Sequence, residues 1–234
     1  MTAIYKRELS SYFNSMIGYV FIAVLVFFTG IYFMAYNLYN GLPQFSYTLY
    51  SLMTILMFAI PLLTMKSMAE ERRSRTDQLL LTAPVSLTGV VLGKFLAMAT
   101  VFLIPVLLCA FCPLIIAMNG EARLLSDYAS LLAFFLMGCV FIAIGMFLSS
   151  LTESQIIAAV STFAVLLVLF LWDDLVSFLP ASLSTLLSAF SFSQVFYNFA
   201  QYSVFDVSGL VLYLTLTFLF LFLTVQTLQR RRWA

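Results

Sequence analysis

Long hydrophobic stretches alternate along the chain with short charged segments. Residues 9–65 contain no Asp, Glu, Lys or Arg. Because a helix needs about 20 apolar residues to cross a bilayer, this stretch is too long for one span. The turn-forming sequence Asn-Gly-Leu-Pro interrupts it at residues 40–43, so the stretch predicts two helices, at 17–39 and 46–68.

Four further charge-free stretches have the length of a single span. With the first two they predict six transmembrane helices, at residues 17–39, 46–68, 90–118, 128–150, 155–172 and 207–228. The segment 175–205 is also free of charge, but it contains Pro180, several serines and no continuous apolar block of about 20 residues. We therefore expect it to form short helices that do not cross the membrane.

The composition excludes a water-soluble fold. Apolar residues make up 63% of the chain and charged residues 9%, whereas a soluble domain has roughly 45–50% and 25%. We expect an all-α polytopic membrane protein with a single domain over residues 1–234. The chain has no histidine, which excludes imidazole metal sites and histidine acid–base chemistry. Cys109 and Cys112 have the spacing of a CxxC motif but lie in an apolar run, so we expect them to pack as small apolar side chains.

The distribution of charge predicts an orientation. With six spans both termini lie on one side, and that side carries ten of the eleven basic residues, Arg123 being the exception. Because loops rich in lysine and arginine remain in the cytoplasm, both termini are expected there. The net charge is then 10 − 5 = +5 inside and 1 − 5 = −4 outside, which restores the total of +1.

The expected spans carry no charge near their middle. Proton-driven transport needs a titratable group in the membrane, so this class is disfavoured. Residues 89–95, Gly-Val-Val-Leu-Gly-Lys-Phe, depart from a P-loop in glycine spacing and lack Ser or Thr after the lysine. We expect them to begin a helix with a small-residue packing face, with Lys94 snorkelling to the cytoplasmic interface. An active transporter of this kind needs an energy source on another chain, and no cofactor is expected on this one.

The cytoplasmic loop at residues 69–89 is expected to have two parts. The first is a charged extension of the second span, and the second is a short helix that Ser74 or Thr76 caps and Pro84 ends. The leucines at 79–81 are too apolar to remain in water. Either the short helix lies on the lipid surface, or it docks into a groove of a soluble partner.

Two shorter segments complete the expected cytoplasmic surface. Residues 2–14 place Ile4, Tyr5, Leu9, Tyr12 and Phe13 roughly on one side of a helix, and Lys6, Arg7 and Glu8 elsewhere. This pattern predicts an amphipathic helix lying at the inner interface. The polar residues 149–155 by themselves predict a tight turn.

Several motifs follow one another in these loops. They read Glu70-Glu71-Arg72-Arg73, Thr76-Asp77-Gln78-Leu79-Leu80, Pro84-Val85-Ser86 and Gly93-Lys94-Phe95. This order resembles the first cytoplasmic loop of type-2 ABC transporter permeases, and within them the permease of the gliding-motility and nitrous-oxide-maturation branch. Residues 6–13 resemble the interfacial elbow helix of that family, residues 149–159 its turn between the fourth and fifth helices, and residues 228–233 its C-terminus.

The resemblance implies a type V ABC exporter-like fold, with segment 175–205 as a pair of outer re-entrant helices between the fifth and sixth spans. It also implies a complex in the bacterial inner membrane of two such subunits, identical or different, and two separate ABC ATPase chains that bind ATP and Mg²⁺. No nucleic-acid partner is expected. The short loop helix becomes the coupling helix, and its expected ATPase-docking residues are Glu71, Arg72, Arg73, Arg75, Thr76, Asp77, Leu79, Leu80 and Pro84. A second cytoplasmic contact is expected at Thr152, Glu153 and Gln155.

The expected function is that of a permease subunit, which couples ATP hydrolysis by a partner chain to export. The outer segment is expected to close the translocation path from above, with Leu187, Phe190 and Phe196 as the outer gate. Two alternatives stay open. One is a secondary transporter that works alone, and the other is a membrane scaffold through which the ATPase acts on an auxiliary envelope protein.

Overall fold

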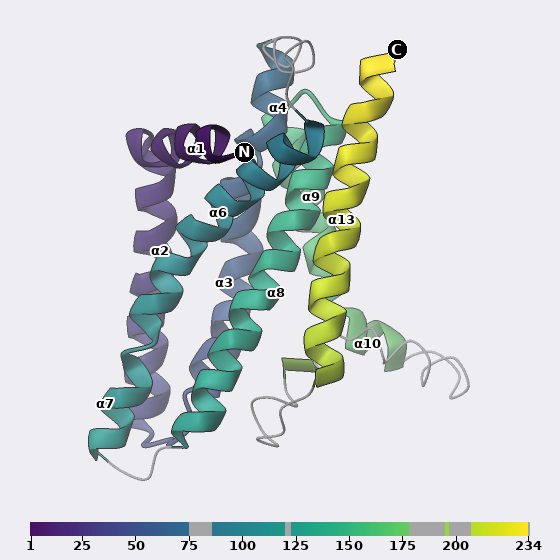
Figure 1. Ribbon diagram of the computed structural model, residues 1–234. Helices are drawn as coiled ribbons and strands as arrows, with labels where there is room; N and C mark the ends of the chain where they lie inside the picture. Colours follow the sequence, from purple (N-terminus) through teal and green to yellow (C-terminus); the bar gives the residue numbers. More distant parts are fainter. Residues whose placement is uncertain (75–85, 120–122, 178–194, 197–206, 234) are drawn as a thin grey trace.

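The described part of the chain is a bundle of long helices. The computed structural model describes residues 1–74, 86–119, 123–177, 195–196 and 207–233, and these residues contain helices, turns and no strand. Figure 1 shows the long helices running side by side between two ends of the bundle. The all-α character predicted from the sequence is therefore confirmed.

Five helical stretches of the described residues are long and apolar enough to cross a membrane. They are α2 (Met16–Phe33) with the π-helix η1 (Met34–Tyr39), α3 (Ser46–Thr64) with α4 (Lys66–Arg73), α6 (Leu87–Cys109) with α7 (Cys112–Asn119), α8 (Leu124–Leu151), and α13 (Val207–Trp233). The helix at the expected fifth span, α9 (Gln155–Phe170), is apolar but only 16 residues long. It measures about 24 Å, which is less than the roughly 30 Å hydrocarbon core of a bilayer. A six-residue helix, α10 (Trp172–Ser177), follows it.

The two ends of the bundle differ. One end, called here the α4 end, carries α4, both termini and α1 (Thr2–Asn14), which lies across the long helices instead of along them (Figure 1). The other end, called here the α7 end, carries α7 and the turn between η1 and α3, and α10 lies toward it. Both termini thus lie on the same side of the bundle.

The transverse helix α1 packs on the start of α2 and on α6. Its partly or fully buried residues include Ile4, Leu9 and Tyr12, at helical spacing. A Cβ added to Gly93 of α6 would lie 3.2 Å from Ile4 Cγ2, so this glycine lets α1 approach. Gly93 therefore contributes to a small-residue packing face, as expected from the sequence.

The third stretch of spanning length is interrupted at a position that the spacing of charged residues does not predict. α6 ends at Cys109, and α7 begins at Cys112 immediately before Pro113. Proline has no amide hydrogen to continue the ladder, and its ring collides with the preceding turn. The single expected span at 90–118 is thus two helices, and the first begins at Leu87.

The turn at residues 40–43 adopts the backbone that its sequence predicts. Gly41 has a φ of +64°, which glycine accepts without steric cost. The Asn37 amide donates to the carbonyls of Leu42 at 2.8 Å and Gln44 at 3.0 Å, and its oxygen accepts from Thr48 Oγ1 at 2.8 Å. These bonds fix the two helices on either side of the turn.

Asp127 also holds this turn. The sequence places it among the acidic residues outside the membrane, but α8 begins before it and buries it almost completely. Its Oδ1 accepts a 2.9 Å hydrogen bond from the backbone N–H of Phe45, near the start of α3. The residue is therefore part of the packing between α3 and α8.

The helix α8 lies at the centre of the core and packs on α3, α6, α9 and α13. Two of its glycines permit the closest approaches. A Cβ on Gly138 would collide with the ring of Phe102 in α6, and one on Gly145 would collide with Thr64 in α3. Because these glycines are seven residues apart, they lie on roughly the same side of α8.

Candidate functional site

The expected coupling region begins with α4, which continues α3 after a break at Met65. The break leaves the amides of the first turn of α4 without partners in their own helix. Ser149 of α8 supplies a hydrogen-bond acceptor at this point. Its Oγ accepts from the N–H groups of Met68 at 3.2 Å and Ala69 at 3.1 Å. The same hydroxyl lies 3.2 Å from the carbonyl oxygen of Met65. A residue 80 positions away thus caps α4 and attaches it to α8.

Arg72 brings the two expected cytoplasmic contacts together. Its Nη2 lies 3.1 Å from Glu153 Oε1, and its Nη1 donates to the carbonyl of Ser150 at 3.3 Å. Glu153 lies in the turn between α8 and α9. The two segments expected to face the cytoplasm, separated by about 80 residues in the sequence, therefore contact each other.

The other expected docking residues are distributed as follows. Arg73 is exposed, and Thr152 and Gln155 are half-buried beside Glu153. Glu71 is mostly buried and faces inward. The remaining predicted docking residues, Arg75, Thr76, Asp77, Leu79, Leu80 and Pro84, lie outside the described residues.

A cluster of four charged side chains, called here the charge cluster, lies beneath this surface. Its members are Arg7, Glu8, Glu71 and Lys94. Lys94 is 2% exposed, and its Nζ lies 2.8 Å from Glu71 Oε1 and 3.2 Å from Glu8 Oε1. The same ammonium donates to the carbonyl of Ser67 at 2.8 Å. The cluster joins α1, α4 and α6.

Two interpretations from the sequence are corrected by this cluster. Lys94 does not snorkel into solvent, because two carboxylates and a carbonyl satisfy its ammonium inside the protein. Glu8 lies on the packed side of α1 and not with Lys6 on the exposed side. Sequence reasoning missed the pairing because its members come from three distant segments, and a lysine inside an otherwise apolar helix was the only signal.

Arg7 completes the charge cluster from the solvent side. Its Nη2 lies 2.7 Å from Glu8 Oε1 and 3.0 Å from Glu71 Oε1. The hydrogen bond to Glu8, with the negative charges of both carboxylates, raises the pKa of the Arg7 guanidinium. Two cations thus face two carboxylates, and the cluster is neutral.

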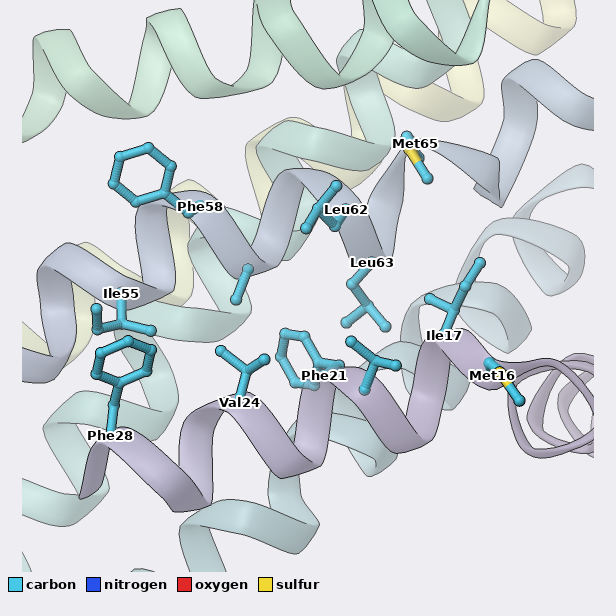
Figure 2. Close-up of a pocket in the computed structure, with 12 residues that line it drawn as sticks. Met16, Ile17, Phe21, Val24, Phe28, Ile55, Phe58, Leu62, Leu63 and Met65 are labelled. Atoms are coloured by element: carbon cyan, nitrogen blue, oxygen red, sulfur yellow. The ribbon is translucent and has the colours of Figure 1, made fainter. Parts of the chain in front are cut away.

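An apolar groove runs between α2 and α3. It has a volume of about 410 Å³, and Figure 2 shows Phe21, Val24 and Phe28 of α2 facing Ile55 and Leu63 of α3. A second, polar pocket of about 510 Å³ lies between α1 and α4, and it includes residues of the charge cluster. The groove is open to the surroundings of the bundle, because its wall residues Val20, Phe58 and Leu62 are exposed.

The expected outer gate is described only at Phe196. This side chain is fully buried and belongs to the hydrophobic core. Leu187 and Phe190 lie outside the described residues. Phe196 therefore packs as an apolar residue of the bundle, while the structure expected for residues 178–194 and 197–205 stays a prediction.

Candidate ligands for a metal ion do not gather in the described residues, where no three His, Cys, Asp or Glu side chains form such a group. The three cysteines are free thiols. Cys109 Sγ lies 3.4 Å from Thr29 Oγ1 and contributes to the packing of α2 on α6.

Comparison with known proteins gives the family. A search of curated proteins finds no match to the chain. Residues 34–225 match the family described as ABC-2 family transporter protein. The match covers most of the chain and includes three of the five stretches of spanning length in full and parts of the other two. Membership implies a multi-pass permease subunit that works with an ABC ATPase, and the chain belongs to the ABC-2 transporter family.

Proposed function

We propose that this permease couples ATP hydrolysis by a separate ATPase chain to the export of a substrate. The proposed assembly has two permease subunits and two ATPase chains, with ATP and Mg²⁺ bound by the ATPases. The observation that carries the proposal is the attachment of α4. This helix extends the second span out of the bundle, and Ser149 and Arg72 attach it to α8 and to the turn before α9.

In the proposed cycle, closure of the ATPase chains moves the loop at 69–89. Because α4 continues α3 and is capped by Ser149 of α8, its displacement is passed to both helices. The Arg72–Glu153 contact extends the displacement to α9. Rigid helices that pivot in this way provide alternating access without any covalent chemistry in the permease.

The proposed topology has six spans, with both termini in the cytoplasm and α9 crossing despite its length. The α4 end is then cytoplasmic and the α7 end faces outward. Phe196, with Leu187 and Phe190, is proposed to close the path at the outer side. The buried position of Phe196 supports this placement, because an outer closure needs an apolar contact with the bundle.

Co-purification with the ATPase tests the proposal. Leu80→Glu is expected to release the ATPase, because burial of one leucine contributes roughly 1.5–3 kcal/mol and a buried unpaired carboxylate costs more. Arg73→Ala is the control and is expected to weaken binding slightly, since exposed ion pairs are worth about 0–1 kcal/mol. An intact complex with Leu80→Glu contradicts the docking assignment.

Transport assays distinguish the exporter from the two alternative functions, a secondary transporter and a membrane scaffold. Substrate flux by the permease alone indicates a secondary transporter. ATPase activity that an envelope partner stimulates, without flux, indicates a scaffold, as the resemblance to the gliding-motility and nitrous-oxide-maturation branch also allows. Flux that requires the ATPase and is lost with Leu80→Glu supports the exporter.

A further inference from the structure

The apolar groove and the polar pocket are two parts of one amphiphilic recess. Ile17 lines both, so the groove between α2 and α3 continues directly into the pocket between α1 and α4. The groove is lined by apolar side chains only. The pocket is lined mainly by charged and hydroxyl side chains. Such a recess matches a ligand that has an apolar tail and a charged head.

The groove has the depth of one membrane leaflet. Along α2 it extends from Met16 to Phe28, and along α3 from Ile55 to Met65. Twelve steps of a helix correspond to about 18 Å, and half of a bilayer core is about 15 Å. Figure 2 shows the side chains Phe28 and Ile55 at one end of the groove and Met16 and Met65 at the other, with Val24 between them. A straight acyl chain entering beside Met16 would end near the bilayer midplane.

The polar pocket offers charges of both signs that have no ion pair. Lys66 and Glu70 line it, and neither forms an ion pair with any described residue. Ser67 lies between them in sequence and also lines the pocket; it is 4% exposed, and its hydroxyl has no hydrogen-bond partner among the described residues. By contrast, Lys94, which also lines the pocket, is paired with Glu8 and Glu71 and donates to the Ser67 carbonyl. Among the described residues, the pocket therefore offers a cation, an anion and a buried hydroxyl that have no partner and could bind a ligand.

We propose that the recess binds one phospholipid from the leaflet at the α4 end, with a zwitterionic headgroup that carries a primary ammonium. Its phosphate pairs with Lys66 and accepts from Ser67, its ammonium pairs with Glu70, and one acyl chain fills the groove. A wholly apolar helix would cover the groove but would offer no charged partner to Lys66 or Glu70. The site goes beyond the proposed export activity, because it requires neither the ATPase nor movement of the lipid across the membrane.

Lipid titration of the delipidated full-length protein in detergent, followed by native mass spectrometry, tests the proposal. The probes are dioleoyl phosphatidylethanolamine and dioleoyl phosphatidylglycerol. Wild type is expected to bind one phosphatidylethanolamine more tightly than phosphatidylglycerol. Lys66→Gln is expected to weaken this binding about tenfold, because one charge-assisted contact is lost. Lys6→Gln removes the same charge from the exposed side of α1, away from the pocket, and is expected to change nothing.

A second pair of variants tests the groove. Val20→Trp fills it from an exposed position, and Val26→Trp adds the same bulk on α2 outside it. Only Val20→Trp is expected to lower phosphatidylethanolamine binding. Equal binding of both lipids, or binding that Lys66→Gln and Val20→Trp leave unchanged, overturns the proposal. A change of oligomeric state with Val20→Trp at unchanged lipid binding also overturns it, because the groove is then occupied by a second copy of the chain.

Discussion

Lys94 is the residue whose surroundings most constrain the α4 end. A buried ammonium is tolerated only where its charge is paired and its protons are bonded. Glu8 and Glu71 provide the charge and the Ser67 carbonyl the third acceptor. Removal of Lys94 leaves two carboxylates close together with Arg7 as their only cation in the cluster, and Arg7 is more than half exposed. The two cations therefore differ: Lys94 is buried and its charge is needed to balance the carboxylates, whereas the charge of Arg7 is screened by water.

We predict that Lys94→Met destabilises the protein strongly. Breaking a buried pair by removing one partner costs about 3–5 kcal/mol. The apparent melting temperature of the purified protein in detergent is expected to fall markedly. Lys6→Met, which removes an exposed lysine of α1, is the matched control, and surface changes of this kind stay within about 0.5 kcal/mol. Equal melting temperatures for the two variants would show that the charge cluster does not stabilise the fold.

The prediction for Gly145 rests on steric packing and not on charge. Gly145→Ala places a Cβ against Thr64, and overpacking of this kind costs about 1–3 kcal/mol. Gly30→Ala on α2 is the control, since nothing lies within 4 Å of the added Cβ. There the change is expected to stabilise by roughly 0.5–1 kcal/mol, because alanine restricts the unfolded chain. Thermal unfolding should move in opposite directions for the two variants, and a shared direction would contradict the close approach of α3 and α8.

At the scale of elements, charge spacing places the helices well and their breaks poorly. A charged side chain is excluded from the bilayer core wherever it occurs, so gaps between charges reveal spans without any knowledge of packing. The break between α6 and α7 has a local signal in Pro113. The break at Met65 has a weaker one, Pro61 within α3. Its other determinant, the hydroxyl of Ser149 in α8, is a tertiary contact that periodicity does not contain.

In the candidate site, too, the sequence predicts which segments contribute but not how their side chains meet. Composition indicates that Arg72 and Glu153 belong to cytoplasmic segments, and a family resemblance assigns both to contacts with an ATPase. Neither source indicates that the two side chains meet at 3.1 Å. The sequence also does not reveal where Glu71 points. In the structure its carboxylate faces inward and pairs with Lys94, whereas Arg73 is exposed. Two positions along α4 thus separate a residue of an internal ion pair from an exposed arginine.

Of the contacts that attach α4 to the bundle, Ser149 is expected to matter most. The Arg72–Glu153 pair is largely solvent-exposed on the Glu153 side, and such pairs contribute about 0–1 kcal/mol. Ser149→Ala removes two hydrogen bonds from the buried amides of Met68 and Ala69, each worth about 0.5–1.5 kcal/mol. We predict faster hydrogen exchange in α4, by about tenfold or more at these two amides.

Ser161→Ala is the control for this measurement. Its hydroxyl bonds to the carbonyl of Ala158 within α9 and not to a neighbouring helix. Exchange in α4 should therefore be unchanged in this variant. If Ser149→Ala and Ser161→Ala give the same exchange in α4, the cap is not what attaches this helix to α8.

At the scale of the whole molecule, the short helix α9 decides the topology. The chain leaves α8 at the α4 end and enters α13 toward the α7 end (Figure 1). It must therefore pass from one end to the other between Leu151 and Val207, and α9 is the longest described helix in this interval. Its 16 residues fall short of a full span, but α10 follows it to Ser177, and Trp172 at the start of α10 is of the type found at membrane interfaces. If α9 crosses the membrane, local thinning of the bilayer would offset the rest of the mismatch at a modest cost.

We predict that α9 crosses the membrane, so that its two ends face opposite sides. Single cysteines introduced into a background without Cys109, Cys112 and Cys139 are labelled in intact cells with an impermeant maleimide. Asn40→Cys at the α7 end and Asp174→Cys in α10 should react from outside, because both residues are exposed. Ser74→Cys and Glu153→Cys should react only after permeabilisation. If Asp174→Cys requires permeabilisation while Asn40→Cys does not, α9 remains on the cytoplasmic side, and the passage to the outer end must be made by the chain between Ser177 and Val207 instead.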